Sequence, residues 1–307
     1  MKSKVEIHYR KHHEIDFNKW DKCIQSSVNG IVYAFSWYLN VVCNEWEALI
    51  QGDYETVMPL TKGKKYQVNY LYQPFFTQQL GIFSTRTIDK YKVEGFLNVI
   101  PEKYKYIEIN LNKFNLLTSE HFDPKNNITY ELDLIDNYEN IFRKYGKNNI
   151  RNIQKAIRFG ISIKVEQLSL EIKEFITKWC KIPGINSKRL EILFDLIKAG
   201  QSNGNLKIYG AYNNTMELCA IGVFVFSMQK ACFILSVAST TGIKNRAMFL
   251  LIDDFIKDHS NENLILDFEG SNIEGIARFY GGFGANPFNY QTIKINRLPF
   301  PFRLLKN

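Results

Sequence analysis

The stretch Leu264-Ile265-Leu266-Asp267-Phe268-Glu269-Gly270-Ser271 decides the fold. Its apolar run is too short for a helix and stops at Gly270, which predicts a strand buried on both faces, as in a parallel sheet. Because side chains alternate along a strand, we expect Asp267 and Glu269 to share one face. A short helix is predicted over residues 274–280, ending in the glycine-rich residues 281–284. The result is a βα unit with acidic groups at the carboxyl end of a strand, where open α/β sheets bind ligands.

Length and composition predict a globular protein of about two domains. The chain has 307 residues, of which 45% are hydrophobic and 23% charged. Its longest apolar run, residues 218–226, has the length of a strand, whereas a membrane helix needs roughly 20 residues. The N-terminus lacks a signal-peptide core. We therefore expect a cytoplasmic protein without stable membrane insertion.

Cysteine and histidine spacing argues against a metal site. The five cysteines are scattered without a C-x-x-C motif, and the histidines show no H-E-x-x-H spacing. We expect free thiols and no bound metal. The formal net charge of +8 favours an anionic partner, which could be nucleic acid, a phosphate-rich cofactor or a membrane surface.

The predicted elements occur twice in the same order, about 155 residues apart. In the first half, strands are predicted at 5–10, 46–51, 56–60, 68–72, 106–111 and 130–134, and helices at 16–26, 36–43, 87–100 and 138–159, the last broken near Gly146. In the second half, strands are predicted at 161–165, 206–212, 217–227, 231–238, 264–269 and 290–295, and helices at 170–179, 187–199, 247–257 and 274–280. With the polar residues 112–128 as a linker, this predicts an α/β protein with a mixed sheet and two duplicated domains, 1–134 and 135–307.

The segment between the strand at 231–238 and the helix at 247–257 is a candidate phosphate site. Small residues and a glycine before a helix N-terminus leave backbone N–H groups free, and these suit a phosphate. A turn is predicted over residues 240–245, and an ordinary βα turn that binds no phosphate is the alternative. The candidate residues are Thr241, Gly242, Ile243, Lys244, Asn245, Arg246 and Ala247.

The acidic strand end carries the candidate catalytic groups. Asp267 or Glu269 could act as a general base if a cleft raises its pKa, and the Tyr280 phenol could protonate a leaving thiolate. A structural carboxylate pair bonded to the backbone or to Arg278, and a packed tyrosine, remain open as alternatives.

Two further segments are candidate binding surfaces. The aromatic and amide-rich residues 72–79 could line a substrate pocket, although aromatic residues at strand ends are more often core; the candidates are Tyr72, Gln73, Phe75, Phe76, Gln78 and Gln79. A basic stripe on the helix at 138–159 could contact phosphates or form a solvated face; it comprises Arg143, Lys147, Arg151 and Lys155, with Lys144 and Arg158 adjacent, while Ile150, Ile153 and Ile157 are predicted to be buried.

The repeated element order resembles the GNAT acyl-CoA N-acyltransferase fold, and two copies in one chain resemble the Fem-type aminoacyltransferases. Residues 147–161 are similar to the basic helix that leads into the second Fem domain, and residues 267–271 with 278–285 are similar to its closing βα segment. The resemblance places the acyl donor in the second domain. The phosphate-loop pattern R/Q-x-x-G-x-G/A falls at residues 239–244, with Ser239 at the first position and Lys244 at the second glycine.

The resemblance implies an N-acyltransferase that moves an acyl group from acetyl-CoA or another acyl-CoA to a small-molecule or peptide amine. A substrate amine would attack the donor carbonyl, with Asp267 or Glu269 as base and Tyr280 assisting the leaving group. The first domain would bind the acceptor, and Arg278 is included among the substrate-binding residues. One alternative uses aminoacyl-tRNA as donor, favoured by the basic stripe and a pI near 9.0 but not by the compact length. Another is a non-catalytic binding module, favoured by the departures in the phosphate loop.

Overall fold

The quoted strand forms where it is predicted. β13 (Ile265–Gly270) pairs in parallel with β12 (Lys230–Ala238) and antiparallel with β8 (Lys125–Asp133). Its central residues, Leu266 to Phe268, are buried, as expected inside a sheet. The computed structural model describes residues 6–118, 120–270 and 272–303, so Ser271 of the quoted stretch and Val5 of the first predicted strand lie outside the described part.

The chain divides into two units, residues 1–128 with 289–307 and residues 129–288. The division predicted at residue 134 differs from this in two places, because residues 129–134 belong to the second unit and residues 289–307 to the first. β8 pairs with β13 through residues 129–133, whereas β14 (Asn286–Asn296) pairs with β7 (Tyr104–Asn110) through residues 292–296. Each unit is therefore completed by the last strand of the other half of the sequence.

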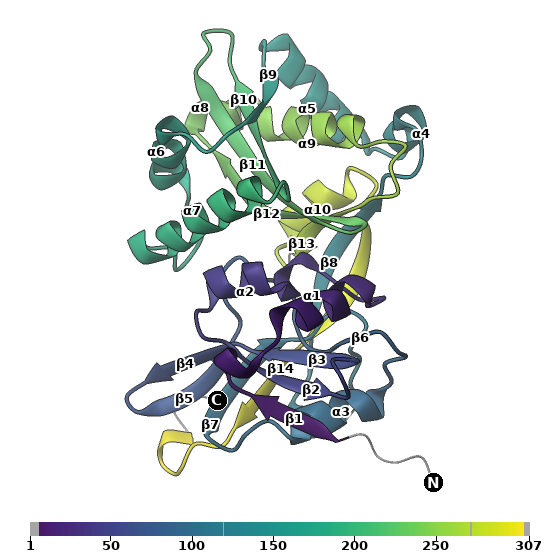
Figure 1. Cartoon of the computed structure of the whole chain (residues 1–307). Coiled ribbons are helices and arrows are strands. Elements are labelled where there is room, and N and C mark those ends of the chain that lie inside the picture. Colours follow the sequence, from purple (N-terminus) through teal and green to yellow (C-terminus); the bar gives the residue numbers. More distant parts are fainter. Residues whose placement is uncertain (1–5, 119, 271, 304–307) are drawn as a thin grey trace. The chain divides into compact units, whose positions relative to one another are not determined.

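The second unit is built on a mixed sheet in the order β8-β13-β12-β11-β10-β9. Helices α5 (Lys147–Arg158) and α9 (Ala247–Asp258) lie side by side against it (Figure 1). Phe255 of α9 stacks on Phe224 of β11 with ring centroids 3.8 Å apart, so aromatic packing fixes this helix on the sheet. The remaining elements are α4 (Tyr138–Arg143), β9 (Ser162–Glu166), α6 (Leu170–Trp179), α7 (Ser187–Ser202), β10 (Leu206–Tyr212), β11 (Leu218–Ser227), α8 (Thr240–Lys244) and α10 (Glu274–Gly281).

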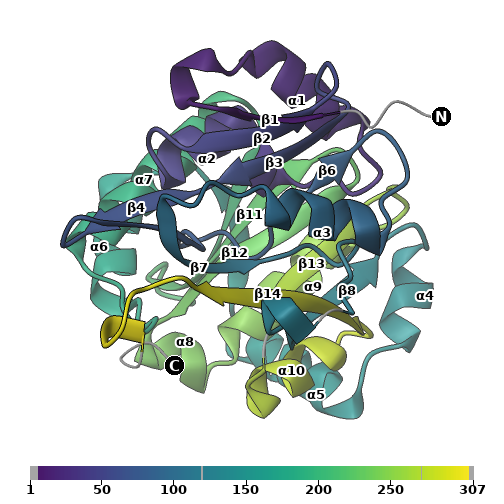
Figure 2. The ribbon, with the colours of Figure 1, turned by 90° about the horizontal axis from the view of Figure 1, so that it is seen from below.

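The first unit has one sheet in the order β1-β2-β3-β6 and a second in which β4, β5, β7 and β14 follow one another. Helix α3 (Lys90–Asn98) lies over β7 (Figure 2), where its Phe96 and Leu97 share a buried core with Ile107 and Ile109. The other elements are β1 (Ile7–Arg10), α1 (Phe17–Ser26), α2 (Ser36–Val42), β2 (Glu47–Gln51), β3 (Thr56–Leu60), β4 (Lys62–Lys65), β5 (Val68–Tyr72) and β6 (Phe83–Ser84).

The predicted elements are confirmed with shifts of a few residues at their ends, and the break near Gly146 separates α4 from α5. Residues 62–65, where no strand is predicted, form β4. The turn predicted over residues 240–245 is wrong, because Ser239 accepts a hydrogen bond from the Gly242 N–H and starts helix α8 there. Burial of Ile157 is also wrong: α5 turns its Asn149, Asn152, Ile153 and Ala156 inward and leaves Ile157 58% exposed.

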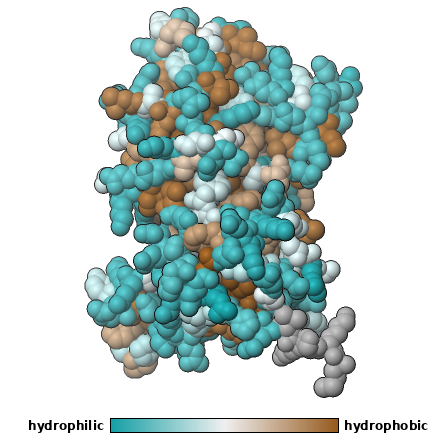
Figure 3. Space-filling view, in the orientation of Figure 1, coloured by the Kyte–Doolittle hydropathy of each residue, from teal (hydrophilic) through white to brown (hydrophobic). Residues whose placement is uncertain are grey.

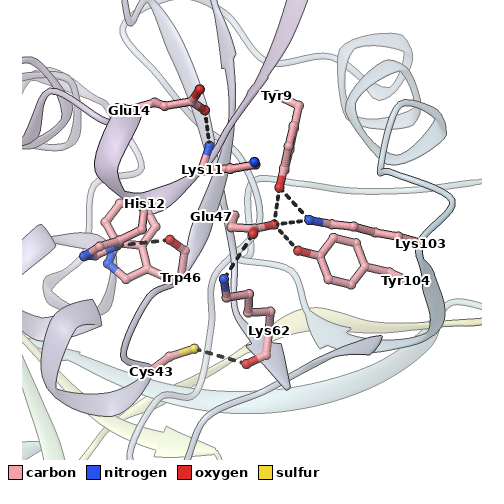
Figure 4. A network of polar contacts seen from close by, with 10 residues as sticks. All are labelled: Tyr9, Lys11, His12, Glu14, Cys43, Trp46, Glu47, Lys62, Lys103 and Tyr104. Atoms are coloured by element: carbon pink, nitrogen blue, oxygen red, sulfur yellow. Dashed lines mark hydrogen bonds and ion pairs between the residues drawn. The ribbon is translucent and has the colours of Figure 1, made fainter. Parts of the chain in front are cut away.

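A buried carboxylate ties several strands of the first unit together. Glu47, at the start of β2, accepts hydrogen bonds from Tyr9 at 2.6 Å, Lys103 at 2.8 Å, Lys62 at 3.0 Å and the Tyr104 hydroxyl (Figure 4). Its side chain is only 5% exposed. Burial raises the pKa of Glu47, but these four hydrogen bonds together lower it to about 2. The carboxylate is thus held ionised as the centre of the cluster.

The surface mixes polar and apolar residues. On the face shown in Figure 3, teal hydrophilic residues surround smaller brown hydrophobic areas, the usual composition of a globular protein surface. Among the described residues, no helix combines the length and the apolar character that crossing a bilayer requires.

Candidate active site

The parallel strands of the second unit separate at the predicted site. β12 and β13 pair only over Lys230–Cys232 and Ile265–Asp267, although β12 continues to Ala238 and β13 to Gly270. Within the described residues, the later part of β12 therefore has no ladder partner on the β13 side. Backbone N–H groups left open along a strand can hold a carbonyl oxygen. The fork between the two strands is a place where a substrate carbonyl can bind.

Asp267 lies at the point where the fork begins, and it is fully engaged. It is 1% exposed. Its carboxylate accepts hydrogen bonds from the Thr129 hydroxyl at 2.7 Å, the Lys230 ammonium at 3.1 Å and the Glu269 N–H at 3.0 Å. Lys230 also bonds Glu131 at 2.6 Å. Asp267 therefore has the structural role that was the alternative to a general base. Its partners are the groups just named and not Arg278.

Glu269 lies beyond the fork point with an unusual backbone. The register of β13 against β8 shifts between Asp267 and Gly270, and the φ of Glu269 is 61°. This left-handed conformation is uncommon for a residue with a side chain. It interrupts the alternation that placed Asp267 and Glu269 on one face, so the two carboxylates lie in different surroundings: Asp267 is buried and Glu269 half-buried.

Tyr280 of α10 packs against β13. Its ring stacks on that of Phe268 with centroids 4.7 Å apart. Burial, and then the charge of Glu269, raises the pKa of Tyr280 above its ordinary value. The phenol is therefore protonated near neutral pH and can donate a hydrogen bond. The Glu269 charge therefore acts on the Tyr280 phenol.

The glycine of the predicted phosphate loop has a packing role. The N–H of Gly242 donates to the Ser239 hydroxyl at 3.1 Å. A β-carbon at this position would lie 2.1 Å from the Cys219 carbonyl oxygen. Gly242 therefore allows α8 to approach β11 closely, and its N–H is already used.

Replacing Gly242 by alanine is expected to destabilise the protein by about 1–3 kcal/mol, because the methyl group would displace a backbone carbonyl. Gly275→Ala in α10 is the matched control: no described atom lies within 4 Å of its added carbon, so it should be neutral or slightly stabilising. Urea denaturation of both variants measures the difference. Equal stabilities of the two variants would contradict the close approach of α8.

The start of helix α9, which follows α8, is a better candidate for phosphate binding than Gly242. Arg246 is the N-cap residue of α9, with a φ of 62° and no side-chain cap. Its Nε atom is buried and makes no hydrogen bond within the described part of the chain. An uncapped helix start beside a guanidinium group is suited to a phosphate. Within the predicted phosphate segment, these features single out Arg246 and Ala247.

The first unit contains a cavity of about 1000 Å³. Tyr72 and Gln73 of the predicted substrate segment line it, with the rings of Tyr70 and Tyr106 and the side chain of Glu108. Tyr106 donates a hydrogen bond to Glu108 at 2.6 Å. Burial, and then this hydrogen bond, raises the pKa of Tyr106. Aromatic and aliphatic residues make up most of the lining and polar residues the rest, as in many small-molecule sites.

The rest of the predicted substrate segment supports the backbone outside the cavity lining. The Phe76 carbonyl accepts from the Tyr38 hydroxyl, and the Gln78 carbonyl accepts from Asn110 at 2.8 Å. Gln79 is 2% exposed, donates to the Gln78 side chain at 2.8 Å and accepts from the Lys113 N–H at 3.0 Å. Phe75 is half-buried. Only Tyr72 and Gln73 of the six predicted residues therefore line the cavity.

Sequence reasoning missed the β7 wall of this cavity. Tyr106, Glu108 and Asn110 alternate with Ile107 and Ile109, which are buried. A tyrosine, a glutamate and an asparagine on one face of a half-buried strand were the signal that could have identified it.

Two other predicted surfaces are exposed. Arg278 of α10 pairs with Glu274 four residues earlier, and its side chain is 75% exposed. On α5, the side chains of Lys147, Arg151 and Arg158 are exposed, and none of these three forms an ion pair with a described carboxylate. The described residues also contain no group of three side chains able to hold a metal ion.

The duplicated units, each with a parallel strand pair beside antiparallel strands, define a mixed α/β protein with a tandem GNAT-like fold. Solved structures agree. FemX matches with a TM-score of 0.64 and 13% identity over 98% of this chain and 100% of its own. L-PGS from Bacillus licheniformis matches with a TM-score of 0.56 and 12% identity over 94% of each chain. A tandem GNAT protein from the clavulanic acid biosynthesis pathway matches with a TM-score of 0.54 and 9% identity over 96% of this chain and 99% of its own.

No family model and no curated protein matches the sequence. At the identities of the structural matches, the likeness concerns the fold: this chain has the GNAT-like acyltransferase fold in its tandem form.

Proposed function

We propose that the protein is an acyltransferase that uses an acyl-CoA, such as acetyl-CoA, to acylate an amine. The observation that carries this proposal is the fork between β12 and β13, with Glu269 and Tyr280 at its acidic end. Backbone N–H groups of β12 that face the fork would hold a thioester carbonyl oxygen. The turn at Arg246 and Ala247 offers an uncapped helix start and a guanidinium group for the phosphates of the donor.

In this reaction the neutral amine attacks the thioester carbon, a C–N bond forms and the C–S bond breaks. Glu269 accepts the proton that the amine nitrogen loses, directly or through water. Tyr280 donates a hydrogen bond to the departing sulfur, and the proton that Glu269 took from the amine finally reaches the thiolate, so that both side chains return to their starting states. Asp267 acts as a positioning residue, because it fixes the backbone of Glu269 through its N–H. The products are an amide and free coenzyme A.

The cavity of the first unit is the proposed acceptor site. Its tyrosine rings provide apolar contact for the body of a small molecule or peptide, and Gln73 and Glu108 provide hydrogen-bonding groups. Gln73 is held in place, since its side-chain oxygen accepts from the Asn110 N–H at 2.9 Å and its amide donates to the Thr77 carbonyl at 2.9 Å.

A thermal-shift assay with coenzyme A, acetyl-CoA and longer acyl-CoAs tests the donor. A ligand at 100 times its dissociation constant should add about 2.7 kcal/mol to the free energy of unfolding. Arg246→Gln should reduce the shift, whereas Lys198→Gln, which removes one exposed charge from α7 of the same unit, should preserve it. Absence of a shift with every acyl-CoA would remove the coenzyme A proposal.

An aminoacyl-tRNA donor is the second candidate. The unpaired basic residues of α5 favour it, because Lys147, Arg151 and Arg158 are exposed on one helix. Transfer of a radiolabelled amino acid from charged tRNA, with no activity on acyl-CoA, would decide for this donor. If neither donor class binds, the binding-module alternative takes its place.

A further inference from the structure

A second cavity, of about 590 Å³, lies in the first unit and has no lining residue in common with the aromatic one. Four side chains with permanent positive charge line it: Lys125, Lys294, Arg297 and Arg303. The other ionisable residues of the lining are Asp123 and His121. Among the described residues, the cavity therefore contains one carboxylate and four cations. A concave site with this charge excess attracts anions.

The cations of this cavity are largely uncompensated. Lys125 and Asp123 are 4.0 Å apart, with side chains 69% and 61% exposed, so water weakens their attraction. No ion pair between described residues involves Lys294, Arg297 or Arg303. Glu108 is the cross-strand neighbour of Lys294 in the β7–β14 register, without an ion pair between them within the described residues.

Hydrogen bonds position the side chain of Arg297 and the backbone of Arg303. Arg297 donates from Nη1 to the Ile100 carbonyl at 3.2 Å, which fixes its guanidinium plane and leaves other N–H groups available. The segment carrying Arg303 is folded back, because the Arg303 N–H donates to the Pro299 carbonyl at 3.2 Å and its own carbonyl accepts from Asn296 at 3.1 Å. Contacts within the protein therefore fix one guanidinium group and the segment that carries the second arginine.

We infer that this cavity binds a small phosphate-bearing molecule, a diphosphate or a phosphate ester, through Lys125, Lys294, Arg297 and Arg303. Arginine donates two parallel hydrogen bonds to phosphate oxygens, and lysine adds a mobile point charge. The volume exceeds that of a single phosphate and falls within the range of small-molecule sites. The lining of this cavity shares no residue with that of the proposed acceptor cavity, and the inference does not depend on the proposed reaction.

Isothermal titration calorimetry with inorganic pyrophosphate tests the inference at low ionic strength, with ADP as a second probe. We expect saturable binding by the wild-type protein. The double variant Lys294→Gln/Arg303→Gln should raise the dissociation constant at least about tenfold, because it removes two charge-assisted contacts. The control Lys22→Gln/Lys90→Gln removes two exposed charges of the same unit outside the cavity and should bind like the wild type.

Three results would overturn the inference. These are no saturable binding of either probe, equal weakening by the two double variants, or binding only to phosphatidylglycerol vesicles. Coenzyme A itself carries phosphates, so the same variants separate the two sites. Lys294→Gln/Arg303→Gln should keep the acyl-CoA thermal shift, and Arg246→Gln should keep pyrophosphate binding. Each site can therefore fail without the other.

Discussion

Replacing Glu47 by glutamine is expected to lower the free energy of unfolding by about 3–5 kcal/mol, the usual cost of removing one member of a buried ion pair. Glutamine has nearly the same shape but no charge. Lys62 and Lys103 would then face a neutral group, and the hydroxyls of Tyr9 and Tyr104 would compete for one oxygen (Figure 4). Urea denaturation at pH 7 measures the change.

Asp53→Asn is the control for this variant, because the Lys19–Asp53 pair has side chains 49% and 75% exposed and should contribute little. A loss of stability in Glu47→Gln no larger than that in the control would contradict the central role of Glu47.

The contribution of Glu47 should also depend on pH in a defined direction. Its pKa falls from 4.5 to about 2 on folding. The folded state therefore binds the proton more weakly than the unfolded state. The stabilisation is complete above pH 4.5 and is lost as the pH falls from there towards 2. The difference corresponds to about 3 kcal/mol. The stability gap between wild type and Glu47→Gln should narrow over this interval, and a constant gap would contradict the assigned ionisation.

Replacing Glu269 by glutamine is expected to lower kcat for acyl transfer by about 10²–10⁴-fold, the usual contribution of a general base. The side chain is half-buried and the backbone of Glu269 is left-handed. Glutamine has nearly the same shape as glutamate, so it should fit there without a large loss of stability. Steady-state kinetics with acyl-CoA and an amine acceptor measures the effect. The KM for the donor should change little, because the carboxylate acts on the amine proton.

Asp267→Asn is the informative comparison for Glu269. Asp267 is an ion-pair partner of Lys230, so its replacement should mainly reduce stability, with a smaller effect on kcat in the protein that remains folded. Glu269→Gln with wild-type kcat would remove Glu269 as the base. Full activity of a variant altered at both positions would remove the carboxylate mechanism altogether.

Local pattern predicted most elements of this fold. The apolar run before Asp267, the helix break at Gly146 and the repeated order of strands and helices all depend on neighbouring residues, and the structure confirms them. The turn predicted over residues 240–245 was wrong because a helix cap was overlooked: the Ser239 hydroxyl caps helix α8 there. The prediction that Ile157 is buried was wrong because helix α5 buries two asparagines on its inner face instead.

The candidate site was less predictable because its partners are distant in sequence. Asp267 receives hydrogen bonds from Lys230 and Thr129, which are 37 and 138 residues away. Such contacts follow from strand register, which a single strand does not encode. The left-handed backbone at Glu269 likewise separates two carboxylates that the alternation rule placed together.

The sequence by itself determined the α/β class, the duplication and the acidic strand end, because hydrophobic periodicity and glycine positions are local properties. Only the tertiary structure decided that β8 completes the second unit and β14 the first, and that β7 rather than residues 75–79 forms a wall of the aromatic cavity. The physical reason is that strand pairing and cavity lining are set by packing between segments far apart in the chain, where backbone hydrogen bonds and buried surface from many elements are satisfied at once.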